Sequence, residues 1–146
     1  MQIMQEAVAI PGDTVEEREI PSDVALVTPL VVRLVEKLVH IGCVDKSNQM
    51  KIELCLDEAI TNAVVHGNKN DFGKVVKVTL FRDDDSWGIV IQDEGEGFSL
   101  EELADKPAED SLWQENGRGI PLMTLYMDEV VFYDGGRTVL LRQVLS

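Results

Sequence analysis

Basic residues are scarce in this sequence of 146 residues: 13 lysines and arginines stand against 27 aspartates and glutamates, which gives a net charge of −14. A field of this sign repels phosphate groups, so we expect no direct binding to nucleic acid. The sequence also lacks any apolar run near the roughly 20 residues that cross a bilayer. Residues 1–10 contain neither a basic region nor a signal-peptide apolar stretch. We therefore expect a cytoplasmic location without membrane contact.

Cysteine is equally rare. Cys43 and Cys55 share no metal-ligand spacing with each other or with His40 and His66. We expect two reduced thiols, with Cys55 packed in the core. Because 45% of the residues are hydrophobic and 27% are charged, the length suits one compact domain that buries its own core.

Hydrophobic periodicity and turn residues divide the chain into helices and strands. Strands are predicted at 14–20 (an edge strand), 74–81, 87–92, 130–133 and 138–144. Helices are predicted at 23–41, 48–66 and 120–127, with Ser22 and Ser47 as N-caps of the first two and Gly42 and Gly67 as their stops. Pro29 either kinks the first helix or marks a later start.

The order of these elements is helix, helix, hairpin, long polar stretch (99–116), helix, hairpin, with no repeat and no linker. Residues 1–13 are expected to form a loose segment and residues 14–146 one domain. A mainly antiparallel sheet with helices stacked on one face is the simplest architecture for this order. The expected fold class is therefore a two-layer α/β sandwich.

The second predicted helix carries a polar row along the edge of its apolar face. Glu58, Asn62 and His66 are spaced i, i+4 and i+8. Asparagine is a poor helix former because its amide competes for backbone hydrogen bonds. Its presence in the middle of a helix therefore indicates a possible functional role. One reason is a metal site, because Mg²⁺ takes oxygen ligands, and Glu58 would then orient or deprotonate a nucleophile. The alternative is an ordinary solvated flank.

A first glycine turn, residues 93–97, directly follows the strand at 87–92. Asp93 at a strand end can accept a hydrogen bond from an exocyclic amine such as that of adenine. Gly95 and Gly97 let the backbone approach a flat ring or a phosphate. A plain strand-ending turn explains these residues equally well.

A second glycine turn consists of Gly117, Arg118 and Gly119, and Pro121 places the start of the last predicted helix close to it. Free N–H groups and the helix dipole would form a phosphate seat there, to which Arg118 adds a cation. A tight loop-to-helix turn is the alternative. Neither glycine turn is a Walker A loop or a Rossmann fingerprint. The stretch between the two turns suits a lid over one ligand.

In this order and spacing, the three motifs resemble the N, G1 and G2 boxes of the GHKL ATPase superfamily, named for gyrase, a heat-shock chaperone, histidine kinases and MutL. The resemblance covers nearly the whole chain from about Ile20. Within the superfamily, the chain is most similar to the bacterial anti-sigma-factor serine/threonine kinases, through residues 56–63 (LDEAITNA) and 127–130 (MDEV). The ATP-binding domain would fill the chain, so we expect no phosphoacceptor-histidine domain in it.

The resemblance implies a Bergerat-type sandwich that binds ATP and Mg²⁺. It places Asn62 on Mg²⁺, Asp93 with its glycines at adenine, and the second glycine turn at the phosphates. It also implies that Glu58 is the general base toward a serine or threonine of a small anti-sigma-factor antagonist. A sigma factor, held inactive in a nucleotide-dependent way, is the other implied partner, and members of this group often form homodimers.

The sequence departs from some relatives, which carry an arginine just before the second glycine turn. Here Glu115 and Asn116 occupy that stretch, and residues 98–116 are strongly acidic. Two hypotheses therefore stay open: a kinase, or a nucleotide-gated module that binds a regulator without phosphorylating it. An interaction domain without ATP is the third and weakest alternative.

Overall fold

The computed structural model describes residues 2–98 and 119–145. Its strands form a six-stranded sheet in the order β1-β5-β6-β4-β3-β2. All neighbouring strands pair antiparallel except β1, which runs parallel to β5. β2 lies at one edge, as predicted for residues 14–20. The strands span Gln2–Ile3 (β1), Asp13–Pro21 (β2), Val75–Arg82 (β3), Ser86–Gln92 (β4), Glu129–Tyr133 (β5) and Thr138–Val144 (β6).

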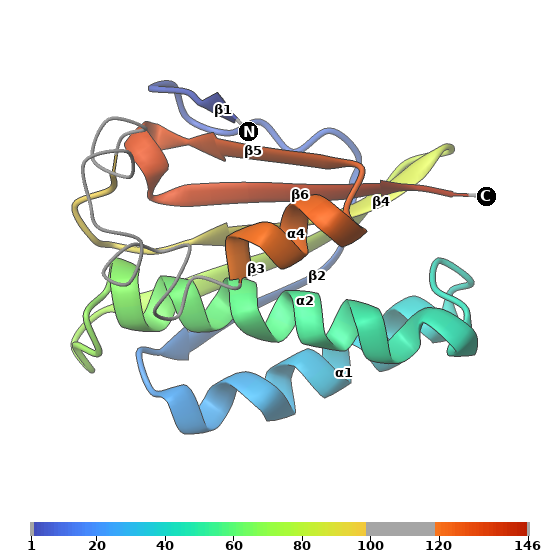
Figure 1. Ribbon diagram of the computed structural model, residues 1–146, viewed down its shortest axis with the longest axis horizontal. Helices are drawn as coiled ribbons and strands as arrows, with labels where there is room; N and C mark the ends of the chain where they lie inside the picture. The colour runs from blue at the N-terminus through green and yellow to red at the C-terminus, as the bar shows by residue number, and fades with distance from the viewer. Residues whose placement is uncertain (1, 99–118, 146) are drawn as a thin grey trace.

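Within the described residues, the α-helices α1 (Val27–His40), α2 (Gln49–Asn62) and α4 (Gly119–Tyr126) cover one face of the sheet (Figure 1). α2 lies between α1 and α4 and contacts both. The apolar helix side chains share one core with alternate strand positions such as Val78, Ile89 and Leu141. This arrangement confirms the predicted two-layer sandwich with a mainly antiparallel sheet. No helix in the described part of the chain is long and apolar enough to cross a membrane.

The start of the first helix differs from the prediction. Ser22 does not cap it: this serine is fully buried and donates a hydrogen bond to the carbonyl of Lys74 at 2.8 Å. Asp23 provides the cap instead, through its carboxylate, to a short 3₁₀ turn (η1, Val24–Leu26) that precedes α1. Pro29 stands in the first turn of α1, so it marks the later start rather than a kink.

The second predicted cap is also wrong. Ser47 lies inside a 3₁₀ turn, η2 (Lys46–Asn48), and α2 begins after this turn without a side-chain cap. At its other end α2 stops at Asn62, four residues before the predicted end at His66, and a π-helical turn, η3 (Ala63–Gly67), continues the chain. Both differences arise because non-α turns of the same handedness extend the helical pattern in the sequence.

The first residues of the chain, expected to be loose, contribute to the sheet. β1 pairs with β5, and the N–H of Met4 donates to the carbonyl of Phe132 at 2.8 Å. Val8 and Ile10 then pack on the sheet face opposite the helices, against a small cluster of Phe81, Val90 and Leu140. The N-terminal segment therefore covers part of the sheet face opposite the helices.

Candidate functional site

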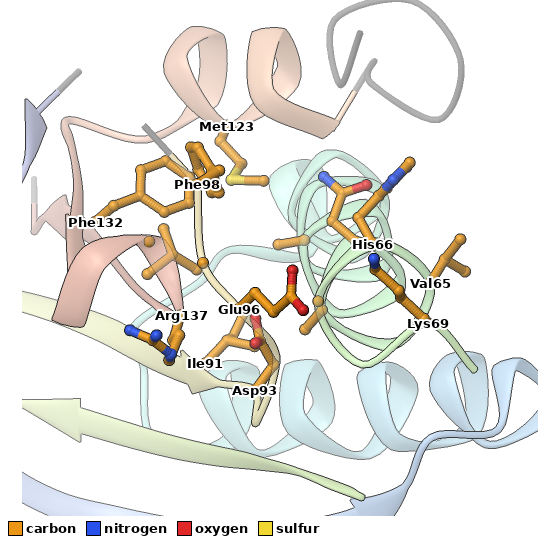
Figure 2. Close-up of a pocket in the computed structure, with 17 residues that line it drawn as sticks. Val65, His66, Lys69, Ile91, Asp93, Glu96, Phe98, Met123, Phe132 and Arg137 are labelled. Carbon is orange, nitrogen blue, oxygen red and sulfur yellow. The ribbon is translucent and has the colours of Figure 1, made fainter. Parts of the chain in front are cut away.

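A cavity of about 340 Å³ opens between the end of α2, the residues after β4, α4 and the β5–β6 hairpin. Figure 2 shows Phe98, Phe132 and Met123 along one wall, Asp93 near the floor, and Lys69 on the opposite side. The rings of Phe98 and Phe132 meet edge to face, with centroids 4.9 Å apart. An apolar wall facing a few polar groups is typical of a site for a small molecule that contains a flat ring.

Asn62, the last residue of α2, lines this cavity. Its side-chain oxygen and nitrogen are both buried, and neither has a hydrogen-bond partner among the described residues. A buried polar group without a partner costs about 1–3 kcal/mol. The presence of an amide here despite this cost is consistent with a ligand that supplies the missing partner. The amide oxygen of Asn62 suits a hard cation such as Mg²⁺.

The turn after Asn62 explains how this wall of the cavity is shaped. In the π-helical turn η3 the N–H of Asn68 donates to the carbonyl of Ala63, five residues back, at 2.8 Å. The two residues that follow, Lys69 and Asn70, take the left-handed conformation (φ 54° and 58°). π-helical turns within α-helices are frequent at functional sites. This turn lets His66, Gly67 and Lys69 all line the cavity.

Asp93 lies directly after β4, and its carboxylate accepts a hydrogen bond from the N–H of Gly95 at 2.8 Å. Burial raises the pKa of Asp93 to about 6, although the Gly95 N–H and the charges of Arg137 and Lys74 act in the opposite direction. A partly buried carboxylate at a cavity wall is a strong acceptor for a ligand amine.

The two glycines of the first turn are required by close contacts. A Cβ on Gly95 would overlap the carbonyl of Gly67, and a Cβ on Gly97, whose φ is 78°, would overlap the carbonyl of Gly135. The turn therefore touches the end of the α2 segment on one side and the β5–β6 hairpin on the other. These two contacts fix the turn so that Asp93 lines the same cavity as Asn62.

The structure brings together some of the predicted site residues. Asn62, Asp93 and Gly97 line the cavity, and Gly95 lies beside it. Glu58 is half-buried on α2, one turn before Asn62, and is not among the lining residues. Gly119 begins α4, close to the predicted helix start. Gly117 and Arg118 lie outside the described residues, and the individual roles of all these residues stay predictions.

Two cations that the sequence did not indicate line the cavity, Lys69 and Arg137. Arg137 also donates to the carbonyls of Gly95 (2.9 Å) and Asp134 (2.8 Å), so it fixes the first glycine turn. Lys69 follows Gly67 by two residues, and this short distance in the sequence could have indicated that it lies at the site. Arg137 has no such local signal, because only the sheet brings it to Gly95.

Comparison with known proteins agrees with this geometry. Residues 20–143 match the family model of the histidine kinase-like ATPase domain. The chain is 32% identical to an anti-sigma F factor of Geobacillus sp. (strain WCH70) over 101 residues, which cover 66% of this chain and 69% of that protein. It is 29% identical to an anti-sigma F factor of Clostridium perfringens (strain 13 / Type A) over 100 residues, 65% of this chain and 71% of that one. The family match covers most of the chain, and the sandwich fold and the cavity are consistent with it. The chain therefore belongs to the family of histidine kinase-like ATPase domains.

Proposed function

We propose that this protein binds Mg-ATP in the cavity and acts as a regulatory serine/threonine protein kinase of the anti-sigma-factor type. Its protein substrate is a small anti-sigma-factor antagonist, and a sigma factor is the partner that it sequesters. The observation that carries the proposal is the buried amide of Asn62, which has no partner among the described residues and shares a cavity with Asp93. The relatives named anti-sigma F factor supply the class of partner.

The base of ATP lies against the apolar wall of Phe98, Phe132 and Met123. The carboxylate of Asp93 accepts a hydrogen bond from the 6-amino group of adenine, and the close backbone at Gly97 leaves room for the ring. Lys69 faces the cavity from the side of α2 and adds positive charge for the phosphates in an otherwise acidic protein. The second glycine turn, Gly117 to Gly119, completes the phosphate site.

The Asn62 side-chain oxygen would hold Mg²⁺, which neutralises phosphate charge when bound. Glu58, one turn earlier on the same helix, acts as the general base. It takes the proton from the hydroxyl of the acceptor serine or threonine as that oxygen bonds to the γ-phosphorus. The bond from the γ-phosphorus to the bridging oxygen breaks at the same time, and ADP leaves.

Labelled-phosphate transfer from ATP to a purified anti-sigma-factor antagonist from the same genome tests the assignment. Glu58→Gln keeps the size of the side chain and removes the base, so we expect transfer to fall at least about 100-fold. Calorimetric affinity for Mg-ADP should stay unchanged. Glu53→Gln is the matched control, because this half-buried glutamate lies on the same helix and away from the cavity lining. Transfer at the wild-type rate in Glu58→Gln means that the assigned base is wrong.

A nucleotide-gated partner-binding module without kinase activity is the second candidate function. It is favoured by one observation: Glu58 is absent from the cavity lining formed by the described residues. A sigma factor from the same genome should then bind with different affinity in the presence and absence of Mg-ATP while no phosphate moves. Equal affinity in both conditions rules this candidate out.

A cytoplasmic location and a homodimer complete the proposal. Both follow from the resemblance to anti-sigma-factor kinases. Sedimentation of the purified protein over a range of concentrations tests the dimer, and a concentration-independent monomer mass refutes it.

A further inference from the structure

Asn68, the first residue after the π-helical turn, is the best-connected buried side chain near the cavity. It is 1% exposed. Its amide nitrogen donates to the hydroxyl of Ser22 (2.8 Å) and to the carbonyl of Val75 (3.0 Å), and its amide oxygen accepts from the N–H of Glu94 (2.7 Å). Asn62, only six residues earlier, has none of these bonds. The two amides therefore serve different ends, one open to a ligand and one used entirely within the protein.

The bonds of Asn68 form part of a closed ring. The carboxylate of Glu94 accepts from the N–H of Val75 at 2.6 Å, while the carbonyl of Val75 accepts from Asn68 and Asn68 accepts from the N–H of Glu94. Ser22 extends the ring to the end of β2, because its hydroxyl and its N–H both bond to the carbonyl of Lys74. Three segments far apart in the sequence are thus held at one point.

This ring adjoins residues that line the proposed nucleotide site, namely Gly67, Lys69 and Asp93. Glu94 is bonded covalently to Asp93, and Asn68 to Gly67. A Cβ on Gly67 would overlap the Asp93 carboxylate, and one on Gly95 would overlap the Gly67 carbonyl. Yet neither Asn68 nor Glu94 lines the cavity, so any effect on a ligand passes through the residues beside them.

From this geometry we infer that Asn68 is a positioning residue, which fixes the Asp93 carboxylate relative to the Asn62 amide through the ring with Glu94 and Val75. The inference rests on the proposed nucleotide site for its consequence: Asn68 sets the separation between the group that binds the base and the group that binds the metal. An error in that separation weakens every ligand that must reach both.

The test uses two routes into the ring. Asn68→Ser removes the amide that bonds to Ser22, Val75 and Glu94 in the interior. Glu94→Ala removes only the bond from the N–H of Val75. Because Glu94 is exposed, we expect this second variant to fold. Glu94→Gln keeps an acceptor oxygen and is the conservative rescue. Ser86→Ala is the matched control, because Ser86 is fully buried and hydrogen-bonded at the opposite end of β4.

We expect the Kd of Mg-ADP, measured by calorimetry, to rise about tenfold in Glu94→Ala and Asn68→Ser, which corresponds to about 1.4 kcal/mol. Glu94→Gln and Ser86→Ala should stay within about twofold of the wild type. Amide hydrogen exchange in residues 93–97 of the ligand-free protein should accelerate in the first two variants only.

The two readouts separate the two ideas. Wild-type exchange at 93–97 in Glu94→Ala overturns the positioning role, and so does a wild-type Kd alongside faster exchange. Absence of Mg-ADP binding by the wild-type protein overturns the proposed function instead, and the exchange data then still decide whether Asn68 positions the turn.

Discussion

Asp93→Asn should make the ligand-free protein more stable while weakening its affinity for nucleotide. Burial raises the pKa of the Asp93 carboxyl from its ordinary 3.8 to about 6, and Asp134 adds to the rise against the opposing Gly95 N–H, Arg137 and Lys74. A carboxyl with a raised pKa binds its proton more tightly in the folded than in the unfolded state. Its charged form therefore destabilises the folded protein, and this penalty grows from about pH 4 to pH 6 and is constant above.

The size of the effect follows from the two pKa values. A difference of about two units corresponds to about 3 kcal/mol at pH 7.5. The pKa of about 6 already includes the attraction of Arg137 and Lys74, but the asparagine brings an amide N–H₂ that needs a partner. We therefore expect a net gain of about 1–2 kcal/mol, or a few degrees in melting temperature for a protein of this length.

Urea unfolding of the nucleotide-free protein at pH 7.5 and pH 5 measures the gain. The lower value keeps clear of the isoelectric point of about 4.4. The stability difference between variant and wild type should shrink by about 1 kcal/mol at pH 5, because part of the wild-type carboxyl is then protonated. Asp84→Asn, an exposed carboxyl in the β3–β4 turn, is the control and should show no gain at either pH.

A variant that is less stable than the wild type at pH 7.5, or a difference that does not change with pH, refutes the reasoning. Calorimetry gives the opposite half of the prediction. A neutral amide oxygen is a weaker acceptor than a carboxylate, so affinity for Mg-ADP should fall about tenfold or more. Stability and binding should thus move in opposite directions upon one substitution.

The remaining predictions concern three other positions. Gly97→Ala should cost about 1–3 kcal/mol of stability and abolish Mg-ADP binding by calorimetry, because its φ of 78° is strained for alanine and the methyl would overlap the Gly135 carbonyl; tight binding contradicts this. Asn62→Leu should leave the ligand-free protein at least as stable, since the buried amide has no partner among the described residues, while Mg²⁺ should no longer strengthen nucleotide binding; a large drop in melting temperature argues for a hidden structural role. Burial raises the pKa of Cys55 to about 12, so an aromatic disulfide reagent should label it, by mass spectrometry, only in urea; prompt labelling of the folded protein disproves its burial.

Local patterns were sufficient to predict most of the fold. The apolar spacing of Leu26, Leu30, Leu34 and Leu38 predicts a one-sided helix. The last three side chains are buried in α1, whereas Leu26 lies in the turn before α1 and is 38% exposed. The strand at 138–144 was predicted with its observed bounds. These features depend on neighbours within one or two turns of chain, and such neighbours can be read directly from a sequence.

Features that depend on distant partners could not be predicted. Ser22 matches the pattern of a helix cap, but its hydroxyl bonds to a carbonyl and an amide 52 and 46 residues away. The residues of η3 continue the helical pattern of α2, and nothing local distinguishes a π-helical from an α-helical turn. β1 is two residues long, too short for any periodicity. Asn62 and Asp93 could be predicted to lie near each other because their motifs follow in a fixed order along the chain, and both line the cavity. Arg137 and Asn68 could not be predicted in this way, because they meet Gly95 and Glu94 only in the folded protein.

The β5–β6 turn connects the N-terminal segment with the first glycine turn at the cavity. Gly135 donates its N–H to Met4 (3.0 Å) and accepts from the N–H of Phe98 (2.9 Å) through its carbonyl. Contacts of such long sequence separation slow folding, because the loop-closure entropy must be lost before they form. The cavity therefore exists only in a chain whose β5–β6 hairpin has docked. An incompletely folded chain would not bind nucleotide. Nucleotide at 100 times its Kd would raise the free energy of unfolding by about 2.7 kcal/mol, and it would stabilise only the completely folded protein. The nucleotide would therefore favour complete folding as well as serve as a substrate.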